Sequence, residues 1–351
     1  MKRLFSVFIP LALVVGLALP VSAEEKATGA TLVSKPGKTL EPATKRGKND
    51  GKIVVQKPAA KSQVQKEVLK LADQYKAFRA RQAQIVRSFA IMHNSTSYGE
   101  TGQPMGSAPL TQEEIRLPAI VSQLQAIKIM LECQTDSGTG DLQYWIRTEC
   151  VLNRQGQTTV TVLNGMIQND GAAMHPLLRA ALSIVANSLN SSIHVNDKAS
   201  GDSNFWCNAS AFTRDALHTA ATNIGQLLSS LPCPQPGDCT SSLTGTLWVL
   251  ENFLQANEDS GTGSPDFWLR TQSLLCVQAT GAANALDNLS RLNISPLARI
   301  MLQNESNSLR SASTRYSGAT GDANFWMNAS GVTLNALHTT ANNLRNFRQS
   351  L

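Results

Sequence analysis

The side chains most suited to chemistry are two histidines that recur in a repeated stretch of sequence. Residues 199–224 and 319–344 are identical at 16 of 26 positions, at an offset of 120. The shared residues include Asn208, Asn328, His218 and His338. An imidazole titrates near neutral pH, so a histidine in each copy can serve as a ligand or as a general base. No catalytic partner accompanies either histidine, so we expect these four to be binding residues at most, and retained architecture is favoured.

No other motif indicates an enzyme or a cofactor. The chain has no phosphate-binding P-loop, no G-x-S-x-G nucleophile elbow, no H-E-x-x-H zinc motif and no dinucleotide fingerprint. Residues 136–141 and 196–202 are rich in oxygen-bearing side chains but lack the ligand alternation of a calcium loop. Asp202 and Asp322 instead stand where a carboxylate caps the start of a helix. We expect no metal and no cofactor.

Six cysteines form the next chemical group, and an even number is typical of disulfides in an exported chain. Cys233 and Cys239 enclose a short Pro- and Gly-containing turn. Cys133 and Cys150 are both missing from the second copy, as expected if they pair. The expected pairs, in decreasing order of support, are 133–150, 233–239 and 207–276, the last joining Cys207 and Cys276. Zinc is disfavoured because no histidine lies close in sequence and no C-x-x-C is present.

Residues 1–23 have the layout of a secretory signal peptide. Lys2 and Arg3 precede an almost wholly apolar run over residues 4–19, and a small-residue site ending at Ala23 follows. The run is short for a helix that spans a membrane. We expect cleavage near Ala23 and a mature chain in the periplasm or outside the cell.

The body of the chain is predicted to be an internal duplication of helices. Beyond the stretches above, residues 137–148 match residues 260–271 at an offset of 123. This recurrence predicts helical repeats over 95–235 and 236–351. Four Gly-containing loops, each followed by an aromatic-Trp pair at intervals of about 60 residues, predict two helical hairpins per repeat. The fold class is therefore all-α, and the strand-like run 158–162 is interpreted as helix.

A long helix is predicted over residues 58–94, ahead of the repeats. Apolar residues recur there at alternating steps of four and three, with Gln82 as the single polar break. The seam consists of Val64, Val68, Leu71, Tyr75, Phe78, Gln82, Ile85, Phe89 and Met92. Two interpretations stay open: an intermolecular coiled coil, and an amphipathic helix packed on the body of the same chain.

The basic charge of the chain lies in its N-terminal part. Residues 24–90 carry 15 Lys and Arg against 6 Asp and Glu, whereas residues 91–351 carry 14 against 19. Residues 24–57 combine this charge with Pro and Gly and no apolar periodicity, which predicts a disordered basic linker. The linker is a solvated spacer or a contact to an anionic envelope surface. Without interleaved aromatic residues, it is not expected to bind nucleic acid.

These features favour a non-enzymatic function in the bacterial cell envelope. We expect an exported structural or accessory component, for example of a secretion or conjugation apparatus. It would self-associate through its N-terminal helix and bind other envelope proteins. The alternative is a periplasmic ligand-binding or sensing module that uses a groove between the duplicated halves.

Overall fold

The protein is described by a computed structural model, in which residues 59–96, 111–231, 239–261 and 263–351 are placed. Side chains are not described for residues 59–62 and most of residues 83–96. The expected signal peptide (1–23) and basic linker (24–57) lie outside the described residues. The chain divides into Met1–Val54 and Val55–Leu351, and every described helix belongs to the second unit.

The described residues form helices and no strands, which confirms the all-α prediction. In chain order the helices are α1 (Ala59–Thr96), α2 (Gln112–Glu132), α3 (Leu142–Asp170), α4 (Pro176–Ile193), α5 (Ser203–Ser230), α6 (Cys239–Gln255), α7 (Pro265–Ser290), α8 (Pro296–Thr314) and α9 (Ala323–Ser350). The strand-like run 158–162 lies inside α3, as interpreted from the sequence. No described helix has the length and apolar composition needed to cross a bilayer.

Aspartates start three of the long helices. The Oδ1 atoms of Asp141, Asp202 and Asp322 each accept a hydrogen bond of 2.9 Å from the backbone N–H three residues later. Each bond satisfies one of the N–H groups that have no partner within the first helical turn. The oxygen-rich loops therefore act as helix caps, which confirms the prediction for Asp202 and Asp322.

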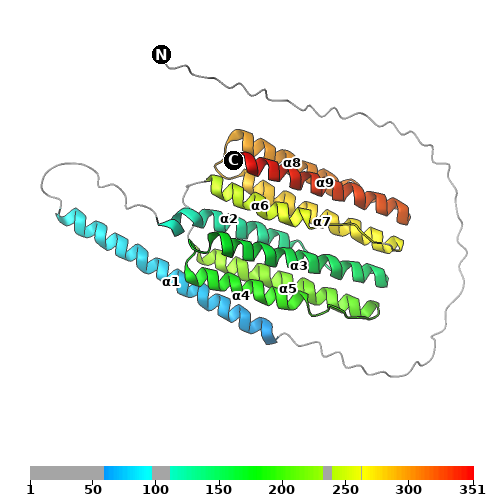
Figure 1. Ribbon diagram of the computed structural model, residues 1–351, viewed down its shortest axis with the longest axis horizontal. Helices are drawn as coiled ribbons and strands as arrows, with labels where there is room; N and C mark the ends of the chain where they lie inside the picture. The colour runs from blue at the N-terminus through cyan, green and yellow to red at the C-terminus, as the bar shows by residue number, and fades with distance from the viewer. Residues whose placement is uncertain (1–58, 97–110, 232–238, 262) are drawn as a thin grey trace, which may run out of the picture. The chain divides into compact units, whose positions relative to one another are not determined.

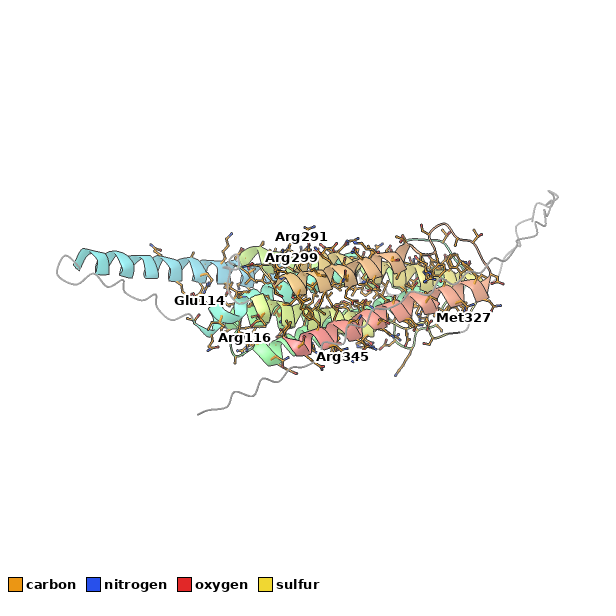
Figure 2. All side chains as sticks on the ribbon, turned by 90° about the horizontal axis from the view of Figure 1, so that it is seen from above. Glu114, Arg116, Arg291, Arg299, Met327 and Arg345 are labelled. Atoms are coloured by element: carbon orange, nitrogen blue, oxygen red, sulfur yellow. The ribbon has the colours of Figure 1, made fainter. Side chains whose placement is uncertain are left out.

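Helices α2 to α9 run alternately up and down, side by side (Figure 1). Pairs far apart in sequence lie together: α2 packs on α6, and α3 packs on α7. Around them α3 contacts α4 and α5, while α7 contacts α8 and α9. Figure 2 shows Met327, near the start of α9, at the opposite end of the bundle from Arg116 near the start of α2. The loops before α3, α5, α7 and α9 lie at the Met327 end.

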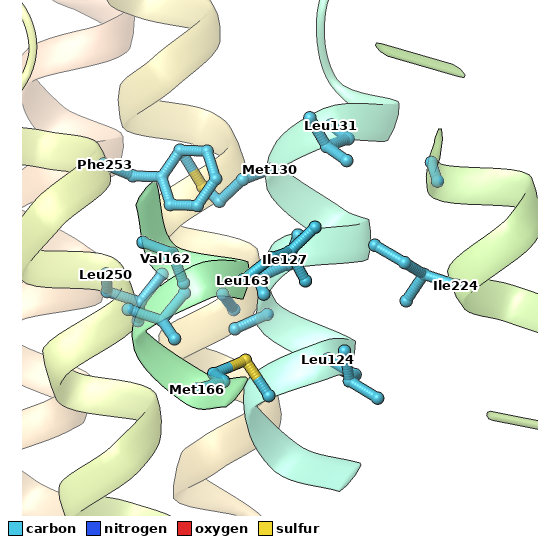
Figure 3. Close-up of a cluster of buried hydrophobic side chains, with 14 of the residues drawn as sticks. Leu124, Ile127, Met130, Leu131, Val162, Leu163, Met166, Ile224, Leu250 and Phe253 are labelled. Atoms are coloured by element: carbon cyan, nitrogen blue, oxygen red, sulfur yellow. The ribbon is translucent and has the colours of Figure 1, made fainter. Parts of the chain in front are cut away.

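The hydrophobic core joins the two predicted repeats. Figure 3 shows part of it, in which α2 and α3 face α6 and α5. The side chains drawn there include Leu124, Ile127, Met130, Leu131, Val162, Leu163, Met166, Ile224, Leu250 and Phe253, all of them fully or almost fully buried. Burial of one such side chain stabilises the fold by about 1.5–3 kcal/mol, so the halves hold each other together.

Helix α1 packs on the body of its own chain, against α4 and α5. Val68, Ala72 and Tyr75 are buried in this contact, and the Tyr75 hydroxyl donates to Glu113 at the start of α2. Packing in cis, one of the two interpretations left open by the sequence, is therefore present for the first half of the helix. The seam residues of the second half, Ile85, Phe89 and Met92, lie outside the described side chains.

Candidate functional site

The two repeated histidines hold the ends of helices. The Nε2 atom of His218 lies 2.9 Å from the backbone carbonyl oxygen of Gln134, two residues after α2 ends. His338 Nε2 lies 3.0 Å from the carbonyl oxygen of Asn257, two residues after α6 ends. A carbonyl only accepts, so Nε2 carries the hydrogen in both rings. Each histidine thus ties α5 or α9 to the chain leaving another helix.

The structure does not bring the repeated asparagines to the histidines. Asn208 and Asn328 are exposed and precede His218 and His338 by ten residues in the same helix. Ten residues span about 15 Å along a helix axis. A shared site of asparagine and histidine is not formed within one helix, and the binding role of these residues stays a prediction.

Two buried arginines make reciprocal contacts between α3 and α7. Arg147 Nε donates to Thr271 Oγ1 over 3.1 Å, and Arg270 Nε donates to Thr148 Oγ1 over 2.9 Å. The four side chains are at most 3% exposed. Because Arg147 and Arg270 occupy matching positions in the 123-residue offset, the same bond is made twice in opposite directions.

Each guanidinium also holds the loop in front of the other helix. Arg270 donates to the carbonyl oxygens of Thr135 and Ser137 over 3.0 and 3.1 Å, and Arg147 donates to that of Glu258. The Arg270 guanidinium lies 4.7 Å from the centre of the Tyr144 ring. Burial lowers the pKa of both arginines below the ordinary arginine value. These hydrogen bonds use the donors of both arginines to hold the loop before α3 and the loop before α7.

Buried amide side chains make further hydrogen bonds between the two predicted repeats. Gln278 Nε2 donates to Gln134 Oε1 over 2.8 Å, and Gln155 Nε2 donates to Asn257 Oδ1 over 3.3 Å. The two contacts again join matching positions of the predicted repeats in opposite order. Amides donate and accept hydrogen bonds, whereas guanidinium groups only donate them. These contacts between α3, α7 and their loops contain no nucleophile beside a base. The chemical role of these hydrogen bonds is to hold α3 and α7, with the loops before them, in one alignment.

Glu149 is a buried carboxylate that sequence reasoning missed. It is 2% exposed, and its Oε1 accepts hydrogen bonds from Thr213, Asn153 and Asn196 at 2.9, 3.1 and 3.2 Å. Its Oε2 is buried without a hydrogen-bond partner. Burial raises the pKa of this carboxyl above the ordinary glutamate value. Its place on a buried face, four residues after Trp145, was the signal available in the sequence.

The described cysteines are free thiols. Cys133, Cys150, Cys207 and Cys276 have no disulfide partner in the structure, so the pairs 133–150 and 207–276 are not formed there and stay predictions. Burial raises the pKa of Cys133 to about 12 and that of Cys276 to about 11. Such thiols stay protonated at neutral pH and are poor nucleophiles. The pair 233–239 lies outside the described side chains.

The described residues contain no group of three or more His, Cys, Asp or Glu side chains that could hold a metal ion. Acidic residues of the oxygen-rich loops have other partners. Asp136 accepts a hydrogen bond from Arg214, and Asp197 lies 2.7 Å from His194 Nδ1. These contacts, like the caps, fasten the loops to neighbouring helices.

A surface pocket of about 380 Å³ lies between the two predicted repeats. Its walls come from α2, α3, α6 and α9 and include Arg116, Gln123, Asp170 and Arg348. Gln123 is 5% exposed and its Oε1 has no hydrogen-bond partner. Burial raises the pKa of Asp170, which the charge of Arg116 partly opposes. The pocket therefore presents charges of both signs, from Arg116, Arg348 and Asp170, to a small polar molecule.

Comparisons with protein-family models, with curated proteins and with solved structures found no match to this chain. The functional conclusion therefore depends on the residues and contacts of the chain itself. Those contacts fasten helices and loops to one another, and the features left over are the helix α1 and the pocket between the halves.

Proposed function

We propose that the chain is an exported, non-enzymatic structural or accessory component of a bacterial cell-envelope assembly, such as a secretion or conjugation apparatus. In this proposal it self-associates through its N-terminal helix. The observation that carries the proposal is the length of α1. Its 38 residues span about 57 Å, whereas the 18 residues of α4 span about 27 Å. Much of a helix whose apolar seam is interrupted only at Gln82 is therefore left for a partner.

The proposal includes a body built from two copies of one four-helix unit, each copy consisting of two helical hairpins. The reciprocal contacts of Arg147 with Thr271 and of Arg270 with Thr148 support this duplication. So do the matching bonds of His218 and His338. A duplicated, closely packed body without an evident reaction centre suits a scaffold more than an enzyme.

The N-terminal arm adds a role at the envelope. Export requires the predicted signal peptide, and the basic linker of residues 24–57 would reach an anionic envelope surface. The assembly would consist of further copies of this chain together with other envelope proteins. No nucleic acid is part of the proposal.

Fractionation of a bacterial host that expresses the full chain tests export. We expect the periplasmic fraction to contain a protein that starts at Glu24, measured by intact mass and N-terminal peptide sequencing. The variant Leu13→Arg places a charge in the middle of the apolar run and should stay unprocessed in the cytoplasm. Retention of residues 1–23 on a wild-type chain in the cytoplasm would contradict the proposal. Crosslinking in the same cells then identifies the envelope partners.

The pocket between the repeats favours a second candidate function, a periplasmic ligand-binding or sensing module. A thermal-shift screen of the mature chain against divalent metal ions and small metabolites tests it. A binder should raise the melting temperature of the wild type, and Arg116→Ala, at the pocket rim, should reduce the shift. No shift with any compound would count against this function.

A further inference from the structure

Two grooves that match in sequence are covered differently. Helix α1 lies on α4 and α5. Their matches α8 and α9 pack on α7, and α9 also on α6, but no further described helix covers them as α1 covers α4 and α5. Ala181 of α4 is fully buried, whereas its match at an offset of 120, Met301 of α8, is 36% exposed. Leu177 is half-buried against the core, whereas its match Leu297 is 68% exposed.

The second wall of each groove shows the same difference. Asn223 of α5 is 2% exposed, and its match Asn343 of α9 is exposed. Val332, near the middle of α9, is 37% exposed. In contrast, Leu182 of α4 and its match Leu302 of α8 are both fully buried. Leu297, Met301 and Asn343 are therefore each more exposed than their matches on the two helices that α1 covers.

The occupant is indicated by α1 itself. Among the described side chains of α1, at residues 63–82 and 84, the buried ones are Val68, Ala72 and Tyr75. Figure 2 shows the helix continuing past the end of the bundle. The seam continues along this outer half in the sequence, at Ile85, Phe89 and Met92. The first half of α1 thus packs in the α4–α5 groove, and the second half carries the same apolar heptad spacing.

We infer that the groove between α8 and α9 binds the outer half of α1 from a second copy of this chain. The inference rests on the proposed self-association and names the surface that receives the helix. The inner half of each α1 stays on its own α4 and α5. The contact is heterologous, because one copy supplies the helix and the other the groove, so repeated association gives a ring or an open array.

Two complementary variants of the mature chain, residues 24–351, test the inference. The groove variant is Leu297→Glu with Met301→Glu, at two exposed positions that can take a charge without disturbing the core. The helix variant is Ile85→Glu with Phe89→Glu. The control variant is Val195→Glu with Leu269→Glu, two residues that are 60% and 41% exposed and lie away from the groove. Circular dichroism melting checks that each variant is folded.

Light scattering coupled to size-exclusion chromatography gives the mass of each sample over a range of concentrations. We expect the wild type and the control variant to associate. The groove and helix variants should each require at least a tenfold higher concentration for half-association, about 1.4 kcal/mol or more. An equimolar mixture of these two variants should form a dimer, because one retains the groove and the other retains the helix.

The outcomes separate this inference from the proposed function. A groove variant that associates like the wild type would overturn the inference while self-association stands, and loss of association in the helix variant alone would indicate a coiled coil between two α1 helices. A mixture that stays monomeric while both variants are folded would also overturn it. A wild-type chain that is monomeric at every concentration would overturn self-association, and the groove would then belong to a different protein.

Discussion

At the residue scale, Glu149 is a buried carboxylate with hydrogen-bond partners at only one of its two oxygens. Three donors point at one of its oxygens, and the other oxygen is buried without a partner. The matching residue of the second repeat is Gln272, a neutral side chain of the same shape that is 3% exposed. The fold therefore accepts an uncharged side chain at this position, and the ionised carboxylate of Glu149 carries a desolvation cost.

Glu149→Gln is expected to stabilise the protein at neutral and alkaline pH. The pKa of Glu149 is raised in the folded state, so the folded state binds the proton more tightly than the unfolded state does. The stabilising effect of this proton is complete below the unfolded pKa and is lost as pH rises through the folded pKa. The variant should gain about 1–3 kcal/mol in unfolding free energy at pH 8 and less at pH 4.

Urea unfolding followed by circular dichroism at the two pH values measures this difference. Glu67→Gln, at an exposed position of α1, is the matched control and should change stability little at either pH. A Glu149→Gln variant that is less stable than the wild type at pH 8 would show that the ionised carboxylate is compensated.

Hydrogen bonds between residues close in sequence could be predicted, and those between distant residues could not. The caps at Asp202 and Asp322 depend on three neighbouring residues, so the sequence alone indicates them. The bond between Arg147 and Thr271 joins residues 124 apart, and its existence depends on how α3 and α7 meet. The recurrence of Arg147 as Arg270 marks the position in the sequence, but it does not show that each arginine bonds to the other repeat.

At the scale of elements, close approach of helices is expected to reverse the usual effect of a helical glycine substitution. Replacement of glycine by alanine in an open helix position stabilises it by about 1 kcal/mol. A Cβ at Gly156 in α3 would lie 2.5 Å from Ile193 Cγ2 at the end of α4. Gly156→Ala should therefore lower the unfolding free energy by about 1–3 kcal/mol, because the core is overpacked.

Chemical unfolding at neutral pH checks this value, with Gly331→Ala as the matched control. In α9 the nearest atom to a Cβ at Gly331 is 3.5 Å away, an ordinary contact. The control should be as stable as the wild type or more stable. Equal stability of Gly156→Ala and Gly331→Ala would mean that α3 and α4 lie further apart than described.

The contact between α3 and α7 gives a second prediction at this scale. Arg270→Met removes the donors to the carbonyl oxygens of Thr135 and Ser137 and to Thr148. We expect a loss of about 2 kcal/mol in unfolding free energy, since hydrogen bonds from a charged donor are involved. Hydrogen exchange of the loop before α3 should also become faster.

Hydrogen exchange measured by mass spectrometry reports the loop directly, and Arg291→Met at an exposed position serves as control. If the loop exchanges in Arg270→Met at the same rate as in the wild type and the control, the arginine does not hold the loop.

Helix positions could be predicted because each depends on a local signal. The sequence predicts a long helix over residues 58–94, and α1 spans Ala59–Thr96. Which face of the body α1 meets could not be predicted, because the apolar seam is the same for a partner in cis and in trans. The matching grooves also differ in a way that repeat identity alone does not show.

At the scale of the whole molecule, charge and packing are carried by different parts. The basic residues lie mainly in the arm and α1, and residues 91–351 are net acidic. The basic character of the chain therefore belongs to its N-terminal part and not to the body. The body contributes a rigid pair of halves joined through one core, and α1 is the element that extends beyond it.

The central claim is that mature copies associate through α1, and sedimentation equilibrium of residues 24–351 measures it most directly. The weight-average mass should rise above that of one copy with increasing concentration for the wild type and stay near one copy for Ile85→Glu with Phe89→Glu. A wild-type mass equal to one copy at the highest concentration reached, in a sample shown to be folded, would contradict the account.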